Sequence, residues 1–120
     1  MKFNWCTIKV NNLEESIVFY EEIVGLELDQ RYQAGPDKEI AFLGKGETKV
    51  ELIKDEGISA VNIGSDISLG FEVNSVDEKI AFLKTRNITV KGDIIKPNPH
   101  VQFFYIKDPN GLTIQFVQHM

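Results

Sequence analysis

The amino-acid sequence predicts an α+β fold built from two tandem modules of order βαβββ. In each half, a strand-like stretch of alternating apolar residues leads into a capped helical stripe, and three more strand-like segments follow. The first half can be laid on the second by adding 63 to its residue numbers, and the helical stripes then align without a gap. This shift produces five identities over residues 10–19: Val10 with Val73, Asn11 with Asn74, Glu15 with Glu78, Ile17 with Ile80, and Phe19 with Phe82.

The first module is expected at about residues 1–56. Residues 2–10 alternate like a strand, and Asn12 lies three residues before Glu15, which is the spacing of a capping box. A helix is expected to follow and to end at Gly25, because glycine readily adopts the left-handed conformation of a helix C-terminus. The helical stripe consists of Leu13, Ile17, Tyr20 and Val24, and further strands are expected at about 27–33, 39–43 and 48–54.

The second module is expected at about residues 67–120, after a polar connection at 57–66. Ser75 and Glu78 form a second capping box. Leu69, Phe71 and Val73 mark the preceding strand, Val76, Ile80 and Leu83 mark the helix, and strands are expected at about 88–95, 101–106 and 112–118. The last two strands should form a hairpin, because Pro109 fixes φ and Gly111 tolerates a positive φ.

The size and composition of the chain limit what it can be. Its 120 residues fit a single domain over 1–120, and 42% hydrophobic with 26% charged residues are typical of a globular protein. The net charge of −5 comes without a basic cluster, which argues against nucleic acid and anionic membrane surfaces as partners. No apolar run approaches the ~18 residues of a membrane span. The single cysteine, Cys6, fits a reducing environment, so we expect a cytoplasmic protein.

Each predicted sheet should have one open face, because one helix covers only one side of four strands. Two such modules can curve into a mixed sheet around a shared cleft, with the helices outside. Phe103 and Tyr105 are expected on this open side, opposite Phe104 and Ile106, unless they serve only ordinary sheet packing. Strand alternation assigns further residues to the open faces: Trp5, Thr7, Lys49, Glu51, Ile53, Ser68, Gly70, Thr113, Gln115 and Val117.

Two segments carry a resemblance to a known family. They are Val10-Asn-Asn-Leu-Glu-Glu-Ser-Ile-Val-Phe-Tyr20 with Gly25-Leu-Glu-Leu28, and Phe104-Tyr-Ile-Lys-Asp-Pro-Asn-Gly-Leu-Thr-Ile-Gln-Phe116. Through them the whole chain resembles the vicinal oxygen chelate superfamily, which includes glyoxalase I, extradiol dioxygenases, and the fosfomycin- and bleomycin-resistance proteins. The resemblance implies the two-module fold and a homodimer. It does not fix the activity, because this scaffold hosts many chemistries.

The resemblance also implies where a metal would bind. In the metal-dependent members, each module contributes one ligand from its first strand and one from its last. The corresponding residues here are Trp5, Glu51, Ser68 and Gln115, where glyoxalase I typically has His or Gln, Glu, His and Glu. Only Glu51 is a strong ligand, since Trp5 has no available lone pair and Ser68 is neutral. Because Zn²⁺ or Ni²⁺ needs three or four good ligands, we expect no metal cofactor unless another residue is recruited.

The residues at these positions keep plainer alternatives. Trp5 either stacks on a planar ligand, fills the space of the lost metal, or packs at a dimer interface. Glu51 either acts as a general base or is a carboxylate that water, Lys9 or Lys49 neutralises.

Four other residues also have two readings. Gln115 and Ser68 either orient a ligand through hydrogen bonds or bond to each other. His100 precedes the last hairpin and is either a substitute metal ligand or base, or a solvated loop residue. Cys6 alternates onto the helix-covered face, where we expect a small buried hydrophobe rather than a nucleophile.

Two functions of different classes remain open on this basis. The first is a metal-free protein, similar to the bleomycin-resistance proteins, that binds a partly planar organic molecule in an aromatic-lined cleft. The second is a divergent glyoxalase-like lyase or isomerase in which Glu51 abstracts a proton α to a carbonyl and Gln115 or Ser68 polarises the oxygen. A regulatory partner domain is a third possibility, for which the sequence offers no partner motif.

Overall fold

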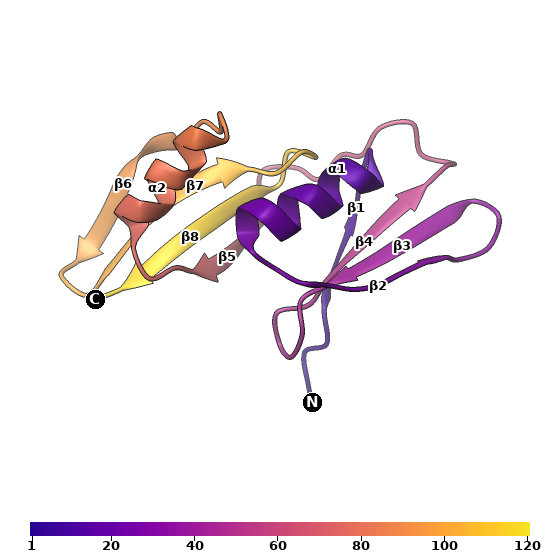
Figure 1. Cartoon of the computed structure of the whole chain (residues 1–120), viewed down its shortest axis with the longest axis horizontal. Helices are drawn as coiled ribbons and strands as arrows, with labels where there is room; N and C mark the ends of the chain where they lie inside the picture. Colours follow the sequence, from indigo (N-terminus) through magenta and orange to yellow (C-terminus); the bar gives the residue numbers. More distant parts are fainter. The chain divides into compact units, whose positions relative to one another are not determined.

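A computed structural model describes residues 1–120 as two compact units, Met1–Ile63 and Gly64–Met120. The first unit is one four-stranded sheet with one helix (Figure 1). The strands lie in the order β1-β4-β3-β2, with β1 parallel to β4 and the other neighbours antiparallel. They are β1 Cys6–Lys9, β2 Leu28–Gln33, β3 Lys38–Leu43 and β4 Val50–Asp55, and the helix runs from α1 Leu13–Val18 directly into a π-helical segment, η1 Phe19–Val24.

The second unit repeats this architecture. Its strands lie in the order β5-β8-β7-β6, and β5 is parallel to β8. They are β5 Ser68–Glu72, β6 Lys91–Asn98, β7 Val101–Lys107 and β8 Thr113–His119, and the helix is α2 Val76–Thr85. The predicted α+β fold with two modules of order βαβββ is therefore confirmed.

The strand registers show how alike the two units are. Thr7 lies opposite Glu51 in the β1–β4 pair, and Gly70 lies opposite Gln115 in the β5–β8 pair. Side chains on neighbouring strands that lie opposite each other share one face of a sheet. Each module therefore brings a residue of its first strand beside a residue of its last strand, far away in the sequence.

Two strand boundaries differ from the prediction. The first strand begins at Cys6 rather than residue 2, because its pairing with β4 begins where Cys6 lies opposite Val50. The strand expected at about 88–95 is β6, at Lys91–Asn98. It starts later because the chain leaves α2 through a left-handed residue, Asn87 with φ of 58°, and the Ile88 N–H still donates to the Leu83 carbonyl at the helix end.

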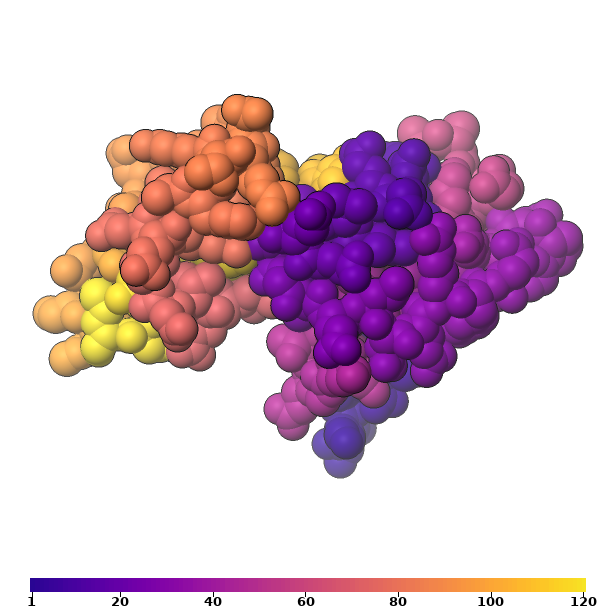
Figure 2. Space-filling model, in the orientation of Figure 1, coloured from indigo at the N-terminus to yellow at the C-terminus, as the bar shows by residue number.

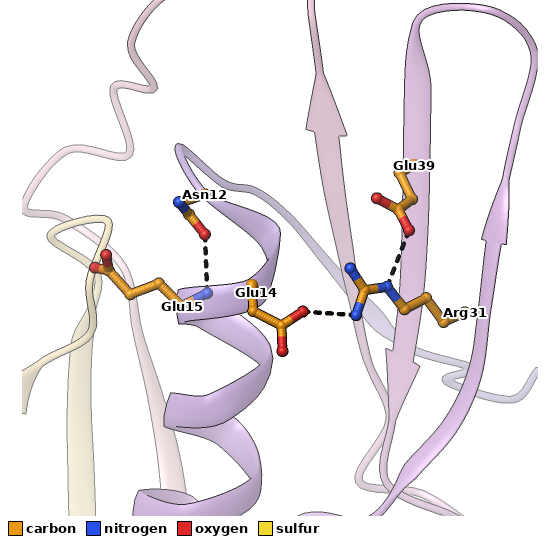
Figure 3. A network of polar contacts seen from close by, with 5 residues as sticks. All are labelled: Asn12, Glu14, Glu15, Arg31 and Glu39. Carbon is orange, nitrogen blue, oxygen red and sulfur yellow. Dashed lines mark hydrogen bonds and ion pairs between the residues drawn. The ribbon is translucent and has the colours of Figure 1, made fainter.

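Both helix N-termini have the predicted caps. The Asn12 side chain accepts a hydrogen bond from the Glu15 N–H at 2.9 Å (Figure 3), and the Ser75 hydroxyl accepts one from the Glu78 N–H at 3.1 Å. Such caps typically stabilise a helix by about 1 kcal/mol. Gly25 ends the first helix with φ of 94°, as predicted.

The core of each unit lies between its helix and one face of its sheet. In β8, Ile114 and Phe116 are buried while Thr113 and Gln115 are only half-buried, which is the alternation that the sequence predicted. In the first helix, Ile23 is buried, whereas the predicted Val24 is only half-buried.

The outer sides of both helices form part of the protein surface, with α1 in violet and α2 in orange-red (Figure 2). None of the helices has the length and apolar character that spanning a bilayer requires.

An ion-pair network ties the first helix to the edge of its sheet. Arg31 in β2 contacts the carboxylates of Glu14 in α1 at 2.7 Å and Glu39 in β3 at 2.9 Å (Figure 3). Arg31 and Glu39 therefore point toward the helix side, which leaves their neighbours Tyr32 and Ile40 for the open face.

The turn between β7 and β8 fixes the strand that carries Gln115. The buried Asp108 carboxylate accepts hydrogen bonds from the Asn110 and Leu112 N–H groups, both at 2.8 Å. Gly111 has φ of 88°, a conformation that glycine adopts without steric cost. The hairpin predicted from this segment is confirmed.

Candidate functional site

The open face of the first sheet has an aromatic pair at one end. Trp5, directly before β1, contacts Phe42 of β3 edge to face, with ring centroids 5.2 Å apart and planes at 80°. This geometry is a favourable one for aromatic rings. The Trp5 side chain remains 43% exposed, so a large part of the indole is available to a ligand.

Glu51 carries the acidic group at the centre of this open face. Its register places it between Thr7 on β1 and Phe42 on β3. The Thr7 hydroxyl donates a hydrogen bond of 2.6 Å to the Glu51 carboxylate. None of the ion pairs in the structure involves Glu51, so its partner is a hydroxyl rather than the ammonium of Lys9 or Lys49.

Lys49 lies just before β4, at the same end of the sheet as Trp5. Its carbonyl accepts a hydrogen bond from the Cys6 N–H at 3.1 Å, which begins the parallel ladder. Cys6 itself is half-buried rather than fully buried, and this burial raises the pKa of its thiol. A raised pKa lowers the thiolate fraction, which agrees with the expectation that Cys6 is not a nucleophile.

On the open face of the second sheet, Gln115 contacts Tyr105 and not Ser68. The Gln115 amide donates a hydrogen bond of 3.5 Å to the Tyr105 hydroxyl, because Tyr105 lies directly opposite Gln115 on β7. Ser68 instead lies opposite Thr113. The reading in which Gln115 and Ser68 bond to each other is therefore wrong.

The end of the Gln115 side chain occupies space that is free because Gly70 has no side chain. A Cβ atom at Gly70 would come within 2.9 Å of the Gln115 Oε1 atom, closer than real Cβ contacts allow. A side chain at position 70 would therefore displace the amide, so Gly70 helps to set its position.

Three predicted residues line one pocket within the second unit. This pocket has a volume of about 240 Å³. Its lining residues are Ser65, Asp66, Ile67, Ser68, Tyr105 and Thr113. Phe103 lies beside it through an edge-to-face contact with Tyr105, with ring centroids 5.7 Å apart. Thr113, one of the lining residues, accepts a hydrogen bond of 3.0 Å from the Lys107 ammonium.

His100 is not part of this pocket. It is exposed in the turn between β6 and β7, where its N–H donates to the Asn98 side chain. Five residues of extended chain separate it from Tyr105, which corresponds to roughly 17 Å. His100 therefore cannot serve as a substitute ligand beside Gln115.

At the four positions that the resemblance equates with metal ligands, the side chains offer few good donor atoms. Trp5 offers no lone pair and Ser68 is a neutral hydroxyl, while the Gln115 amide nitrogen donates to Tyr105, so that only its neutral carbonyl oxygen could act as a ligand. No group of three or more His, Cys, Asp or Glu side chains comes together in a way that could hold a metal ion. Glu51 alone has the chemistry of a good ligand, and one carboxylate is too little for Zn²⁺ or Ni²⁺.

Sequence reasoning missed two contributors to these faces, Phe42 and Lys107, and the role of Gly70. Phe42 supports Trp5, and Lys107 supports Thr113. Alternation along the strands places both on the open side, but only the register between strands shows what they contact. The role of Gly70 likewise depends on the side chain opposite it.

Comparison with known proteins gives a consistent result. The family model described as Glyoxalase/Bleomycin resistance protein/Dioxygenase superfamily matches residues 2–116. A lactoylglutathione lyase of Arabidopsis thaliana is 28% identical over 98% of this chain, which spans only 44% of that relative's length. A probable lactoylglutathione lyase of Vibrio cholerae is 29% identical and covers 93% of this chain and 86% of its own.

A solved structure shows the same fold. A glyoxalase family protein from Bacillus cereus matches with a TM-score of 0.85 and 19% identity, covering 100% of this chain and 95% of its own.

We predict that Gly70→Ala will move the Gln115 side chain with little loss of stability. The new Cβ meets the far end of a flexible side chain, which can swing away, but the hydrogen bond to Tyr105 is then broken. The measurement is the NMR shift of the Gln115 side-chain amide, together with thermal unfolding. In a Gln115→Ala background the same substitution should perturb neither the Tyr105 ring nor the melting temperature. An unchanged Gln115 amide resonance in Gly70→Ala would contradict the packing argument.

Proposed function

The chain belongs to the Glyoxalase/Bleomycin resistance protein/Dioxygenase superfamily, and from that premise we propose that it binds a partly planar organic molecule without a metal ion. The observation that carries the proposal is Trp5. The resemblance equates Trp5 with a ligand position of the metal-dependent members, and its indole is half exposed against Phe42. Large aromatic side chains are suited to stacking on planar ligands.

Further aromatic side chains support this proposal. Tyr32 is 43% exposed on the open side of the first sheet, and Phe103 and Tyr105 are half-buried on the open side of the second. Hydrogen-bonding groups accompany them, with the Thr7–Glu51 pair on one sheet and the Gln115–Tyr105 pair on the other. A few polar groups on an apolar, aromatic surface are typical of small-molecule sites.

The composition of the four ligand positions supports the metal-free part of the proposal. The donors present are one carboxylate, one amide and one hydroxyl, which do not make a site for a borderline metal ion. We propose the ligand contacts to be Trp5, Thr7, Lys49, Ser68, Phe103, Tyr105, Thr113 and Gln115. This proposal also includes the predicted cleft, a homodimer and a cytoplasmic location. It keeps the module limits at 1–56 and 67–120, with the connection at 57–66.

An enzyme is the second candidate, and specific observations favour it. Two relatives described above bear the name lactoylglutathione lyase, and Glu51 is a carboxylate on the open face with a hydroxyl partner. In this reading Glu51 is a general base that abstracts a proton α to a carbonyl. The bound carbonyl oxygen would be polarised by Gln115 or Ser68.

We expect Trp5→Ala to weaken the binding of a planar aromatic probe, 8-anilino-1-naphthalenesulfonate, by ~1–3 kcal/mol, the scale of burying one large apolar side chain. Fluorescence titration of the probe measures this directly. Val18→Ala is the matched control, because Val18 is 41% exposed on the helix side of the same unit and should leave the affinity unchanged. Equal affinity of wild type and Trp5→Ala would refute the role of Trp5.

The metal-free binding proposal predicts no turnover of the hemithioacetal of methylglyoxal and glutathione, with or without added Ni²⁺ or Zn²⁺. The assay follows thioester formation by absorbance. Turnover that disappears in Glu51→Gln but persists in Glu39→Gln, a carboxylate on the helix side, would establish the enzyme instead. Turnover that survives in Glu51→Gln would remove both the metal-free binder and the proposed base.

A further inference from the structure

Two hydroxyl groups in the pocket of the second unit are oriented by the side chains that bind to them. The Tyr105 hydroxyl accepts a long hydrogen bond of 3.5 Å from the Gln115 amide. A phenol can accept and donate at the same time, and the Tyr105 hydroxyl donates to no protein group. Its hydrogen is therefore available to a molecule in the pocket.

The Thr113 hydroxyl also accepts a hydrogen bond without donating one to the protein. This bond of 3.0 Å comes from the Lys107 ammonium, a group that can only donate. The hydroxyl hydrogen must then point elsewhere, and no protein acceptor takes it. The positive charge of Lys107 also makes the Thr113 hydroxyl a stronger donor, because hydrogen bonds polarise one another along a chain.

The two residues that carry these hydroxyls line the same pocket. Tyr105 and Thr113 both line the pocket of about 240 Å³. They lie on adjacent antiparallel strands, where Tyr105 is opposite Gln115 and Lys107 is opposite Thr113, so the two are diagonal neighbours. Diagonal neighbours are roughly 7–8 Å apart, a distance that long side chains bridge toward a shared ligand.

We propose that Tyr105 and Thr113 are a pair of hydrogen-bond donors that holds a carbonyl or carboxylate oxygen of the ligand. This inference rests on the proposed function and specifies its ligand class. In this arrangement Gln115 and Lys107 are positioning residues that direct the two hydroxyl hydrogens toward the ligand. In the proposed metal-free site, these two hydrogen bonds would recognise the ligand oxygen in place of a metal ion.

Two charged side chains of opposite sign, Asp66 and Lys107, lie near the donor pair. Asp66 is exposed at the rim and accepts a long hydrogen bond of 3.4 Å from the Ser65 hydroxyl. The Asp66 carboxylate repels an anion, whereas the Lys107 ammonium, bound to the Thr113 hydroxyl, attracts one. The two charges offset each other in the solvent-exposed rim, so the donor pair determines which ligand oxygen is selected.

The test uses three simple aromatic probes on the whole protein: benzoate, benzamide and benzylamine. Benzoate and benzamide offer an oxygen acceptor, whereas benzylamine is a cation. Two-dimensional NMR titration reports which backbone amides shift and gives the dissociation constants. We expect benzoate and benzamide to shift the amides around Tyr105 and Thr113, and benzylamine not to do so.

Isosteric variants then remove the donors one at a time. Tyr105→Phe and Thr113→Val should each weaken benzoate and benzamide binding on the order of tenfold, as loss of one ligand hydrogen bond does. Lys107→Met should weaken benzoate more than benzamide, and Asp66→Asn should strengthen benzoate. Thr85→Val is the control, because the Thr85 hydroxyl donates to the Phe82 carbonyl in α2 and lies outside the pocket.

The outcomes separate this inference from the function on which it rests. Preferred binding of benzylamine, or benzoate affinity unchanged in both Tyr105→Phe and Thr113→Val, would overturn the donor pair. Failure of all three probes in a protein that still binds the anilinonaphthalene probe through Trp5 would also overturn it, while the proposed function stands. Failure of every probe would overturn both.

Discussion

The parallel pairing of the first and last strand in each module is the constraint on which the candidate site depends. It joins segments that are far apart in the sequence, β1 with β4 and β5 with β8, and it fixes which side chains meet on the open faces. Thr7 reaches Glu51 because of this pairing, and Gly70 makes room for Gln115 because of it. The helices cover the other face of each sheet, so only the open faces are available to a ligand.

The strand pairing is the same in both modules, but the residues on their open faces differ in chemistry. The first module presents a carboxylate held by a hydroxyl, and the second presents an amide that donates to a phenol. Each polar centre has an aromatic ring nearby, Phe42 opposite Glu51 and Phe103 against Tyr105. The two copies of one fold thus present one acidic and one neutral centre.

Much of the fold follows from local sequence patterns. The caps at Asn12 and Ser75, the helix end at Gly25 and the turn around Asp108 were all predictable, because each depends on residues close together in the sequence. The alternation of β8 was also predictable, since a strand with one buried face must alternate. The start of β1 was not, because it depends on where β4 pairs with it.

The contacts of the site residues were less accessible from sequence. The sequence suggests that Gln115 and Ser68 could bond, but the register places Gln115 beside Tyr105. It leaves His100 as a substitute ligand, but the length of β7 carries that residue away from Gln115. Because side chains alternate between the two faces of a strand, the sequence shows which residues lie on the open face. The contact partners on neighbouring strands can be found only from the strand register.

The central claim is that this chain binds its ligand without a metal ion. The most direct measurement is calorimetric titration of Ni²⁺, Zn²⁺, Mn²⁺ and Fe²⁺ into chelator-treated protein. If the chain binds its ligand without a metal ion, no ion should bind stoichiometrically with a dissociation constant below about 10 µM, which corresponds to roughly 7 kcal/mol. Tight binding of one ion per chain, lost in Glu51→Gln, would contradict it and would place the enzyme ahead of the metal-free binder.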